Sequence, residues 1–270
     1  MNILNAWRDF VGFVRLARVY LVFNFRSQSQ YRAAFVWQIV SMALNDTIWL
    51  TFWLFFFEKF PVLGTWTLPD VITMWSVLAA GFGLGIGIAG NANYLATLIL
   101  KGELDPWLLY PRRVLPHLLL GKMSVTSWGD FLFGVFAYVF LVHPSFESML
   151  MFAFLVPCVA VTFIGFSVLV GSLGFFLGSA ESLSEQLRFA LVTFGTYPPS
   201  IFDGVAKLML FTVIPAGFCS YLPVEALKHH SIEYALATAL GSIVILAVGT
   251  SVFYFGLSRY ESGNLMDMRG

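Results

Sequence analysis

Two acidic residues, Asp46 and Asp130, stand inside long apolar runs of this 270-residue sequence. If those runs cross a membrane, an ionisable group within them is a candidate for relaying a proton or binding a cation. A structural role is also open, because Asn45 and Thr47 flank Asp46 and such a polar cluster can pack against a neighbouring helix. We interpret Asp46 as structural, and Asp130, near the start of its run, as a residue that reaches the inner membrane interface.

The residue patterns of nucleotide-binding and hydrolytic centres are missing. Gly121-Lys122-Met123-Ser124 lacks both the upstream glycine spacing and the hydroxyl directly after the lysine that a phosphate-binding loop needs. H-E-x-x-H and G-x-S-x-G do not occur. Glu225, His229 and Glu233 share one helical face, which we interpret as solvated rather than metal-binding. The sequence therefore predicts a chain that is not an enzyme and binds no cofactor or metal itself.

The composition indicates that the apolar runs around Asp46 and Asp130 lie in a membrane. Hydrophobic residues make up 59% of the chain and charged residues 11%, whereas an ordinary globular domain has about 25% charged residues. So little charge cannot cover a water-facing surface. Since one membrane-spanning helix needs about 20 apolar residues, the composition predicts an all-α polytopic membrane protein with a single transmembrane domain.

Six apolar runs follow an N-terminal segment, residues 1–23, whose period is helical but which is too polar to span. Its arginines lie largely opposite its apolar face, as in a helix that lies in the membrane interface. Lys207 starts the fifth run and Pro215 interrupts it, so a broken or re-entrant segment is the alternative there. Residues 179–202 are expected to form an interfacial helix followed by a break. The expected spans are residues 34–57, 71–92, 125–142, 150–177, 205–222 and 235–257.

Basic residues are distributed unevenly over the connections. With the N-terminus inside, 13 lie on inner segments and 2, Lys59 and Lys228, on outer ones. Because cytoplasmic loops are enriched in Lys and Arg, this asymmetry predicts an even number of spans with both termini cytoplasmic. The inner group is Arg8, Arg15, Arg18, Arg26, Arg32, Lys101, Arg112, Arg113, Lys122, Arg188, Lys207, Arg259 and Arg269.

The second expected span carries a dense set of glycines. Two pairs within it have G-x-x-x-G spacing, which lets helix backbones approach closely. We therefore expect this helix to be packed against others rather than exposed to lipid. The residues are Gly81, Gly83, Gly85, Gly87 and Gly90.

The connection after that span, residues 98–122, holds the most specific pattern. Asp105 followed by Pro106 predicts a helix N-cap with proline at the first helical position, and Pro111 prevents the helix from continuing past Tyr110. The result is a very short helix parallel to the membrane, with two arginines where cations are favoured. Its aromatic residues either dip into the interface or dock on a cytosolic protein. The segment is Lys101, Gly102, Glu103, Leu104, Asp105, Pro106, Trp107, Leu108, Leu109, Tyr110, Pro111, Arg112 and Arg113.

Together with the interfacial helix and six spans, two motifs resemble the permease subunits of ABC-2 type transporters. One is the G-x-L-D-x-x-L-x-x-P loop at residues 102–111, and the other is the Y-P-x-S-I segment at residues 197–201. The resemblance covers nearly the whole chain. It implies that two permeases, identical or paralogous, form the pathway in the bacterial inner membrane, and that two separate ATPase subunits, which hold ATP and Mg, bind beneath them. It also implies that residues 98–122 carry the coupling helix and that outer re-entrant helices occur, for which residues 222–231 are the best candidate.

The functional expectation follows from that resemblance. The 29 Phe, 8 Trp and 10 Tyr suit an export pathway for an amphipathic or lipid-like substrate, although aromatic residues facing lipid would give the same count. The expected partners are the ATPase subunits, the second permease and membrane lipid, with no nucleic acid. An ion-coupled secondary transporter that uses Asp46 or Asp130 is the alternative, and a membrane anchor for another enzyme is a third possibility.

Overall fold

The computed structural model describes residues 3–110, 113–178 and 180–260, and the side chains of residues 3–11 and 13 fall outside that description. Over the described residues every regular element is helical, apart from an isolated bridge between Leu63 and Trp66. The α-helices are α1 (Ile3–Gln28), α2 (Arg32–Lys59), α3 (Leu68–Ile88), α4 (Leu95–Leu100), α5 (Asp105–Leu108), α6 (Val114–Leu120), α7 (Ser127–Ala137), α8 (Phe146–Gly171), α9 (Ala180–Gly195), α10 (Gly204–Thr212), α11 (Leu222–His229) and α12 (Ile232–Leu257). The all-α architecture is as expected.

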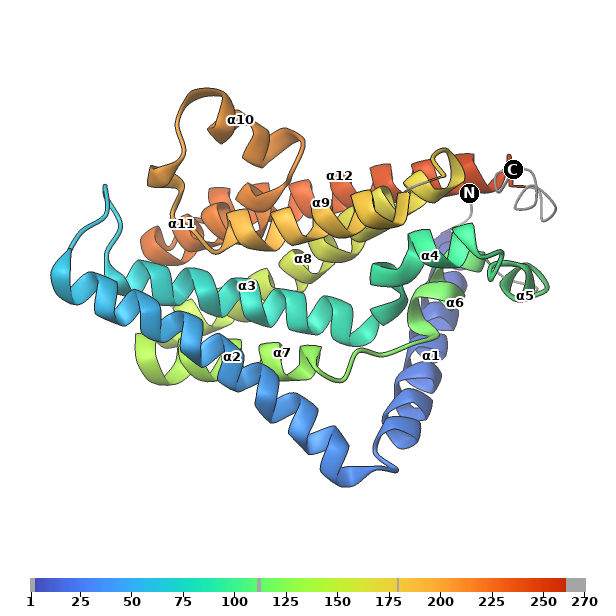
Figure 1. The fold of residues 1–270 in the computed structure, drawn as a ribbon, viewed down its shortest axis with the longest axis horizontal. Helices are drawn as coiled ribbons and strands as arrows, with labels where there is room; N and C mark the ends of the chain where they lie inside the picture. The colour runs from blue at the N-terminus through green and yellow to red at the C-terminus, as the bar shows by residue number, and fades with distance from the viewer. Residues whose placement is uncertain (1–2, 111–112, 179, 261–270) are drawn as a thin grey trace.

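The long helices form an elongated bundle with two distinct ends (Figure 1). The short helices α4, α5 and α6 gather at one end, which we call the α5 end, and α1 stands across the bundle there. The opposite end holds α11 and the connection between α2 and α3, and we call it the α11 end. The described part of the chain starts and finishes close to the α5 end, because α1 packs on α6 and Tyr260 hydrogen-bonds Asp105.

Among the described residues, four helices are long and apolar enough to cross a membrane, so this is a multi-pass membrane protein. They are α2, α3, α8 together with the 3-10 turn Ser172–Phe175, and α12. They overlap the first, second, fourth and sixth expected spans. The third expected span forms the shorter apolar helix Ser127–Val142, in which α7 continues into a π-helical turn.

The fifth expected span, residues 205–222, is wrong as one continuous helix. Helix α10 ends at Thr212, and the next helical segment, Gly217–His229, is bent from it by 77°. Pro215 lies in the break; it has no N–H to donate and it disfavours helical geometry in the residue before it. Helix α11 forms most of the segment that was expected to be re-entrant. It ends at His229, so Glu233 on α12 does not continue the helical face of Glu225 and His229.

Helix α9 is the additional segment that connects the two ends, although residues 179–202 were expected to be interfacial. At its start the Thr97 hydroxyl donates to Glu181 Oε1 at 2.7 Å, beside α4. Near its other end the Tyr221 hydroxyl donates to the Phe194 carbonyl at 2.8 Å. Its 16 residues span about 24 Å. Thus α3, α8, α9 and α12 run along the length of the bundle, with α2 and α7 beside them (Figure 1).

The position of α9 changes the assignment of one basic residue. The Ser200 hydroxyl, just past α9, donates to the Leu63 carbonyl at 3.1 Å in the α2–α3 connection. Lys207, on the next helix α10, therefore lies at the α11 end rather than with the inner group to which the sequence assigned it. It joins Lys59 and Lys228 there.

Helix α3 is the central element, buried along almost its whole length. A β-carbon at Gly81 would lie 2.3 Å from Val159 on α8, and one at Gly83 would lie 2.3 Å from the backbone nitrogen of Phe131 on α7. Gly85 faces the backbone of α8, Gly87 the Trp128 ring, and Gly90 the Lys122 carbonyl. The two G-x-x-x-G pairs thus serve opposite faces of α3, one for α8 and one for α7.

Candidate functional site

The loop expected to couple to a partner lies at the α5 end. Gly102 has φ +71°, and the Glu103 amide donates to the Leu98 carbonyl at 2.9 Å, so Gly102 ends α4 in the left-handed conformation that favours glycine. Leu104 is fully buried in a cluster that includes Leu115 and Phe253. The buried leucine therefore fixes the start of α5 on the bundle.

Asp105 does not act as the helix N-cap, which corrects the sequence interpretation. The N-cap position is Leu104, and Asp105 is the first residue of the helix. Its Oδ1 instead accepts a hydrogen bond from the Tyr260 hydroxyl at 3.0 Å. Burial and the Asp105 carboxyl raise the pKa of Tyr260 to about 12, so the hydroxyl stays protonated and remains a donor at neutral pH. Asp105 thus ties α5 to the end of α12.

The tip of this loop presents apolar side chains outward. Leu108 and Tyr110 are exposed and Leu109 is 86% exposed, whereas Trp107 is half-buried and its ring packs on Gly121. The Tyr110 ring stacks on His117 with centroids 5.2 Å apart. Lys101, Glu103, Pro106 and Arg113 are exposed around the tip, and Pro111 and Arg112 lie outside the described residues. We call Leu108, Leu109 and Tyr110 the loop tip.

A cavity of about 430 Å³ lies among α2, α3, α7, α8 and α9. Eight of its 17 lining residues are aromatic, and we call it the aromatic chamber. Trp49 and Trp75 stack with centroids 6.4 Å apart, and Trp53 meets the edge of Tyr197 at 6.0 Å. Its aromatic lining is Trp49, Phe52, Trp53, Trp75, Phe82, Phe163, Phe189 and Tyr197.

Asp46 and Asp130 meet at the wall of this chamber. Both are buried, with exposed fractions of 5% and 4%, and their side chains share a hydrogen bond. Asp46 faces the neighbouring helix α7, whereas the Thr47 hydroxyl takes no part in this contact and donates to the Ala43 carbonyl. Asp130, which was expected to reach the inner interface, is buried between α7 and α2. Asn45 also lines the chamber.

A close helix contact brings the two acids together. A β-carbon at Gly129 would lie 2.4 Å from the Ile39 carbonyl, so α7 and α2 approach through backbone next to Asp130. Only glycine permits this approach. Asp46 lies one helical turn beyond Met42, whose side chain also faces Gly129. The register between α2 and α7 therefore sets the pairing.

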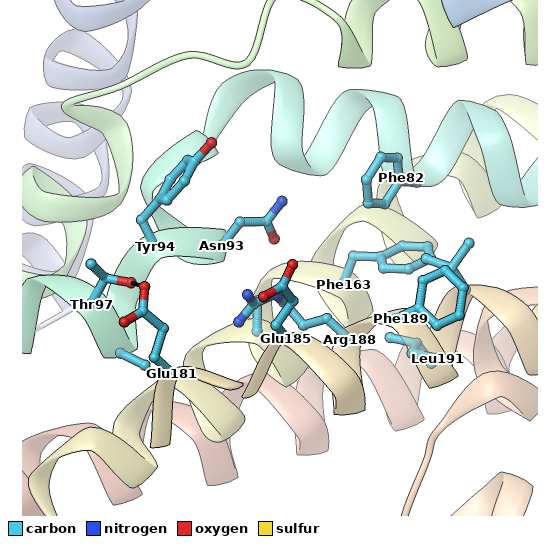
Figure 2. A pocket seen from close by; sticks show the side chains of 13 residues that line it. Phe82, Asn93, Tyr94, Thr97, Phe163, Glu181, Glu185, Arg188, Phe189 and Leu191 are labelled. Atoms are coloured by element: carbon cyan, nitrogen blue, oxygen red, sulfur yellow. Dashed lines mark hydrogen bonds between the residues drawn. The ribbon is translucent and has the colours of Figure 1, made fainter. Parts of the chain in front are cut away.

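A second cavity of about 360 Å³ adjoins the chamber toward the α5 end. The two share Phe82, Phe163, Phe189 and Val192 in their walls. Figure 2 shows Asn93, Tyr94 and Thr97 on one side and three charged residues of α9 on the other, with the phenylalanine rings beyond them. We call this cavity the polar vestibule. The charged residues are Glu181, Glu185 and Arg188.

Sequence reasoning did not single out these three charged residues. Their spacing of i, i+4 and i+7 places them on one face of α9, and that spacing is the signal that was present. Nη1 of Arg188 is buried without a hydrogen-bond partner among the described residues. The charged face of α9 thus lines a cavity inside the bundle.

Comparison with known proteins gives one match. The family model described as ABC-2 family transporter protein matches residues 35–263, which is most of the chain. No curated protein and no solved structure matches. The matched range contains the aromatic chamber, the polar vestibule and the loop tip, and it leaves out the whole of α1.

Proposed function

This chain belongs to the ABC-2 transporter family, and on that premise we propose that it exports an amphipathic substrate as the permease subunit of a transporter driven by separate ATPase subunits. The family membership makes it a membrane transport component. Two ATPase subunits would hold ATP and Mg, and a second permease, identical or paralogous, would complete the assembly in the bacterial inner membrane.

The aromatic chamber is the observation that carries this proposal. Ligand sites are typically cavities of about 300–1,000 Å³ with mostly apolar walls and a few polar groups, and the chamber has about 430 Å³ with aromatic walls and two carboxyl groups. The polar vestibule next to it offers charged and hydroxyl groups. An amphipathic molecule has complementary parts for both cavities.

The loop tip supports docking of the ATPase subunits at the α5 end. Exposed leucines at the end of a bundle are unusual on a water-facing loop unless they meet a partner. Leu104 and the Asp105–Tyr260 hydrogen bond hold this loop firmly on the bundle. When the ATPase subunits close on ATP, they would therefore move α12 together with the loop tip. This requires that the ATP-bound subunits bind one arrangement of the permease better than the other.

The ends of the described chain fit the same orientation. Both lie toward the α5 end, where the ATPase subunits would bind, so both termini would be cytoplasmic. Lys59, Lys207 and Lys228 would then face outward.

A substitution at the loop tip tests the docking. Leu109→Asp should abolish co-purification of the ATPase and substrate-stimulated ATP hydrolysis, because it places a charge into an apolar contact. Val62→Asp is the matched control, since Val62 is exposed in the connection at the α11 end. Retention of full association and coupled transport by Leu109→Asp would refute the docking role.

The Asp46–Asp130 pair favours the ion-coupled alternative as a second candidate. A buried carboxyl pair beside a cavity can carry protons in a secondary transporter. Transport into proteoliposomes separates the two. Loss of transport when the ATPase site is inactivated supports the ATP-driven function, whereas transport driven by a proton gradient without ATP supports the alternative.

A further inference from the structure

The aromatic chamber contains an uncompensated acidic group. Oδ2 of Asp46 is buried and has no hydrogen-bond partner among the described residues, and the side chain lines the chamber. A hydrogen bond between two carboxyl groups requires at least one proton, so the Asp46–Asp130 pair carries at most one negative charge, which a bound cation would favour. Of the described residues that line the chamber, none is Lys, Arg or His. Burying a charge without a partner is costly, so this group is suited to a cationic ligand.

The aromatic wall next to Asp46 also favours a positively charged ligand. Asp46, Trp49 and Trp53 follow one another at i, i+3 and i+7 along α2, and all three line the chamber. Trp75 stacks against Trp49 from α3. Tryptophan faces attract organic cations more strongly than other aromatic rings do, above all in desolvated surroundings. The carboxyl group and the indoles therefore favour the same ligand charge.

A metal ion fits the chamber poorly. Hard cations such as Ca²⁺ take six to eight oxygen ligands, while the walls here are mainly carbon rings. No group of three His, Cys, Asp or Glu that could hold a metal occurs in the described part of the chain. The volume of about 430 Å³ suits a molecule with an apolar body rather than a bare ion.

We propose that the aromatic chamber binds a monovalent organic cation, with the cationic group against Asp46 Oδ2 and the apolar body among Trp49, Trp53 and Trp75. The identification of this cation as the transported substrate rests on the proposed function. The binding itself needs neither ATP nor the ATPase. Glu181 and Glu185 in the polar vestibule place two carboxylates beside one arginine on the side facing the α5 end, which favours entry of a cation there.

The test is equilibrium binding of tetraphenylphosphonium to the full-length permease in detergent, followed by tryptophan fluorescence. Three tryptophans line the chamber, so occupancy should quench the signal saturably. Triphenylphosphine oxide, a neutral compound with similar rings, serves as the comparator. We expect the cation to bind at least tenfold more tightly, which corresponds to about 1.4 kcal/mol.

Two variants locate the charge. The double substitution Asp46→Asn/Asp130→Asn removes it and should weaken cation binding at least tenfold. Asp130→Asn alone should weaken binding less than the double substitution does, because an amide can still donate to the Asp46 carboxylate. Asp203→Asn, the same chemical change at an exposed position near α10, is the control and should have no effect.

Equal binding by the cation and the neutral comparator would overturn the proposal, even if the double variant does not fold. Unchanged cation binding by a folded double variant would do the same. Either outcome would exclude an organic cation as the substrate but would leave the proposed ATP-driven permease function unaffected. Conversely, loss of the docking role of Leu109 would leave cation binding untouched.

Discussion

The packing of α3 against α7 gives a prediction whose size follows from the structure. A methyl group at position 83 would lie 2.3 Å from the Phe131 backbone nitrogen and 2.5 Å from the Ser127 carbonyl oxygen. Non-bonded heavy atoms prefer separations of about 3.5–4.0 Å, so Gly83→Ala must push the two helices apart by about 1 Å. Backbone atoms cannot turn aside as a side chain does.

Overpacking a core costs about 1–3 kcal/mol, while replacing a helical glycine with alanine returns about 0.5–1 kcal/mol. Gly83→Ala should therefore destabilise the permease by about 1–2 kcal/mol. Gly87→Ala is the matched control on the same helix, because its β-carbon would meet only the Trp128 ring, at 3.3 Å. That variant should be neutral or slightly more stable.

The substitution should also act on the chamber. Asp130 lies between the two α7 residues that Gly83 touches, so displacement of α7 draws its carboxyl group away from Asp46. Thermal unfolding in detergent, followed by size-exclusion chromatography, measures the stability of both variants, and tetraphenylphosphonium binding reports the chamber. If Gly83→Ala is as stable as Gly87→Ala and binds the cation equally well, the close α3–α7 contact is not what positions Asp130.

Two further predictions concern the ends of the bundle. Tyr260→Phe removes the hydrogen bond to Asp105 while keeping the ring, so it should leave the permease folded but lower substrate-stimulated ATP hydrolysis several-fold. Tyr234→Phe on α12 is the control. Unchanged ATP hydrolysis by Tyr260→Phe would show that this hydrogen bond does not transmit motion. When an impermeant thiol reagent is applied to intact cells, a single cysteine at position 113 should be shielded and one at position 229 should react. The reason is that Arg113 lies at the α5 end and His229 at the α11 end. The reverse labelling pattern would invert the orientation.

Hydropathy located the helices that carry apolar residues on most sides, and it did not identify α9, whose charged residues face a cavity inside the bundle. Both lipid and a packed core select apolar residues, so α2, α3, α8 and α12 stood out from their sequence alone. Helix α9 carries Glu181, Glu185 and Arg188, and a sequence window cannot tell charges that face outside water from charges that face the polar vestibule. The apolar run after α9 was taken as one span, although Pro215 breaks it into two helices bent by 77°.

The acids show a different limit of sequence reasoning. Asp46 and Asp130 were each found as intramembrane ionisable residues, but their meeting depends on the register of α2 against α7. Gly129 sets that register by its contact with Ile39, and no local pattern specifies which backbone atom it will meet. Asp105 was misassigned for a related reason, because a local capping rule could not anticipate the competing hydroxyl of Tyr260.

The close backbone contacts also indicate how motion at the α5 end can reach the chamber. Helix α12, tied to α5 through Tyr260, meets α8 where a β-carbon at Gly249 would lie 2.4 Å from the Gly165 carbonyl, so the two helices fit too closely to slide freely past one another. Phe163, on the same helix α8, lies in the wall shared by the chamber and the vestibule and meets the edge of Phe82 on α3 with centroids 5.2 Å apart. Gly81 and Gly85 hold α8 equally close to α3, so we expect a displacement of α12 to carry α8 and α3 with it and to keep these two rings together. The wall shared by the two cavities can then change only on the side of α9, which contributes Phe189 and Val192.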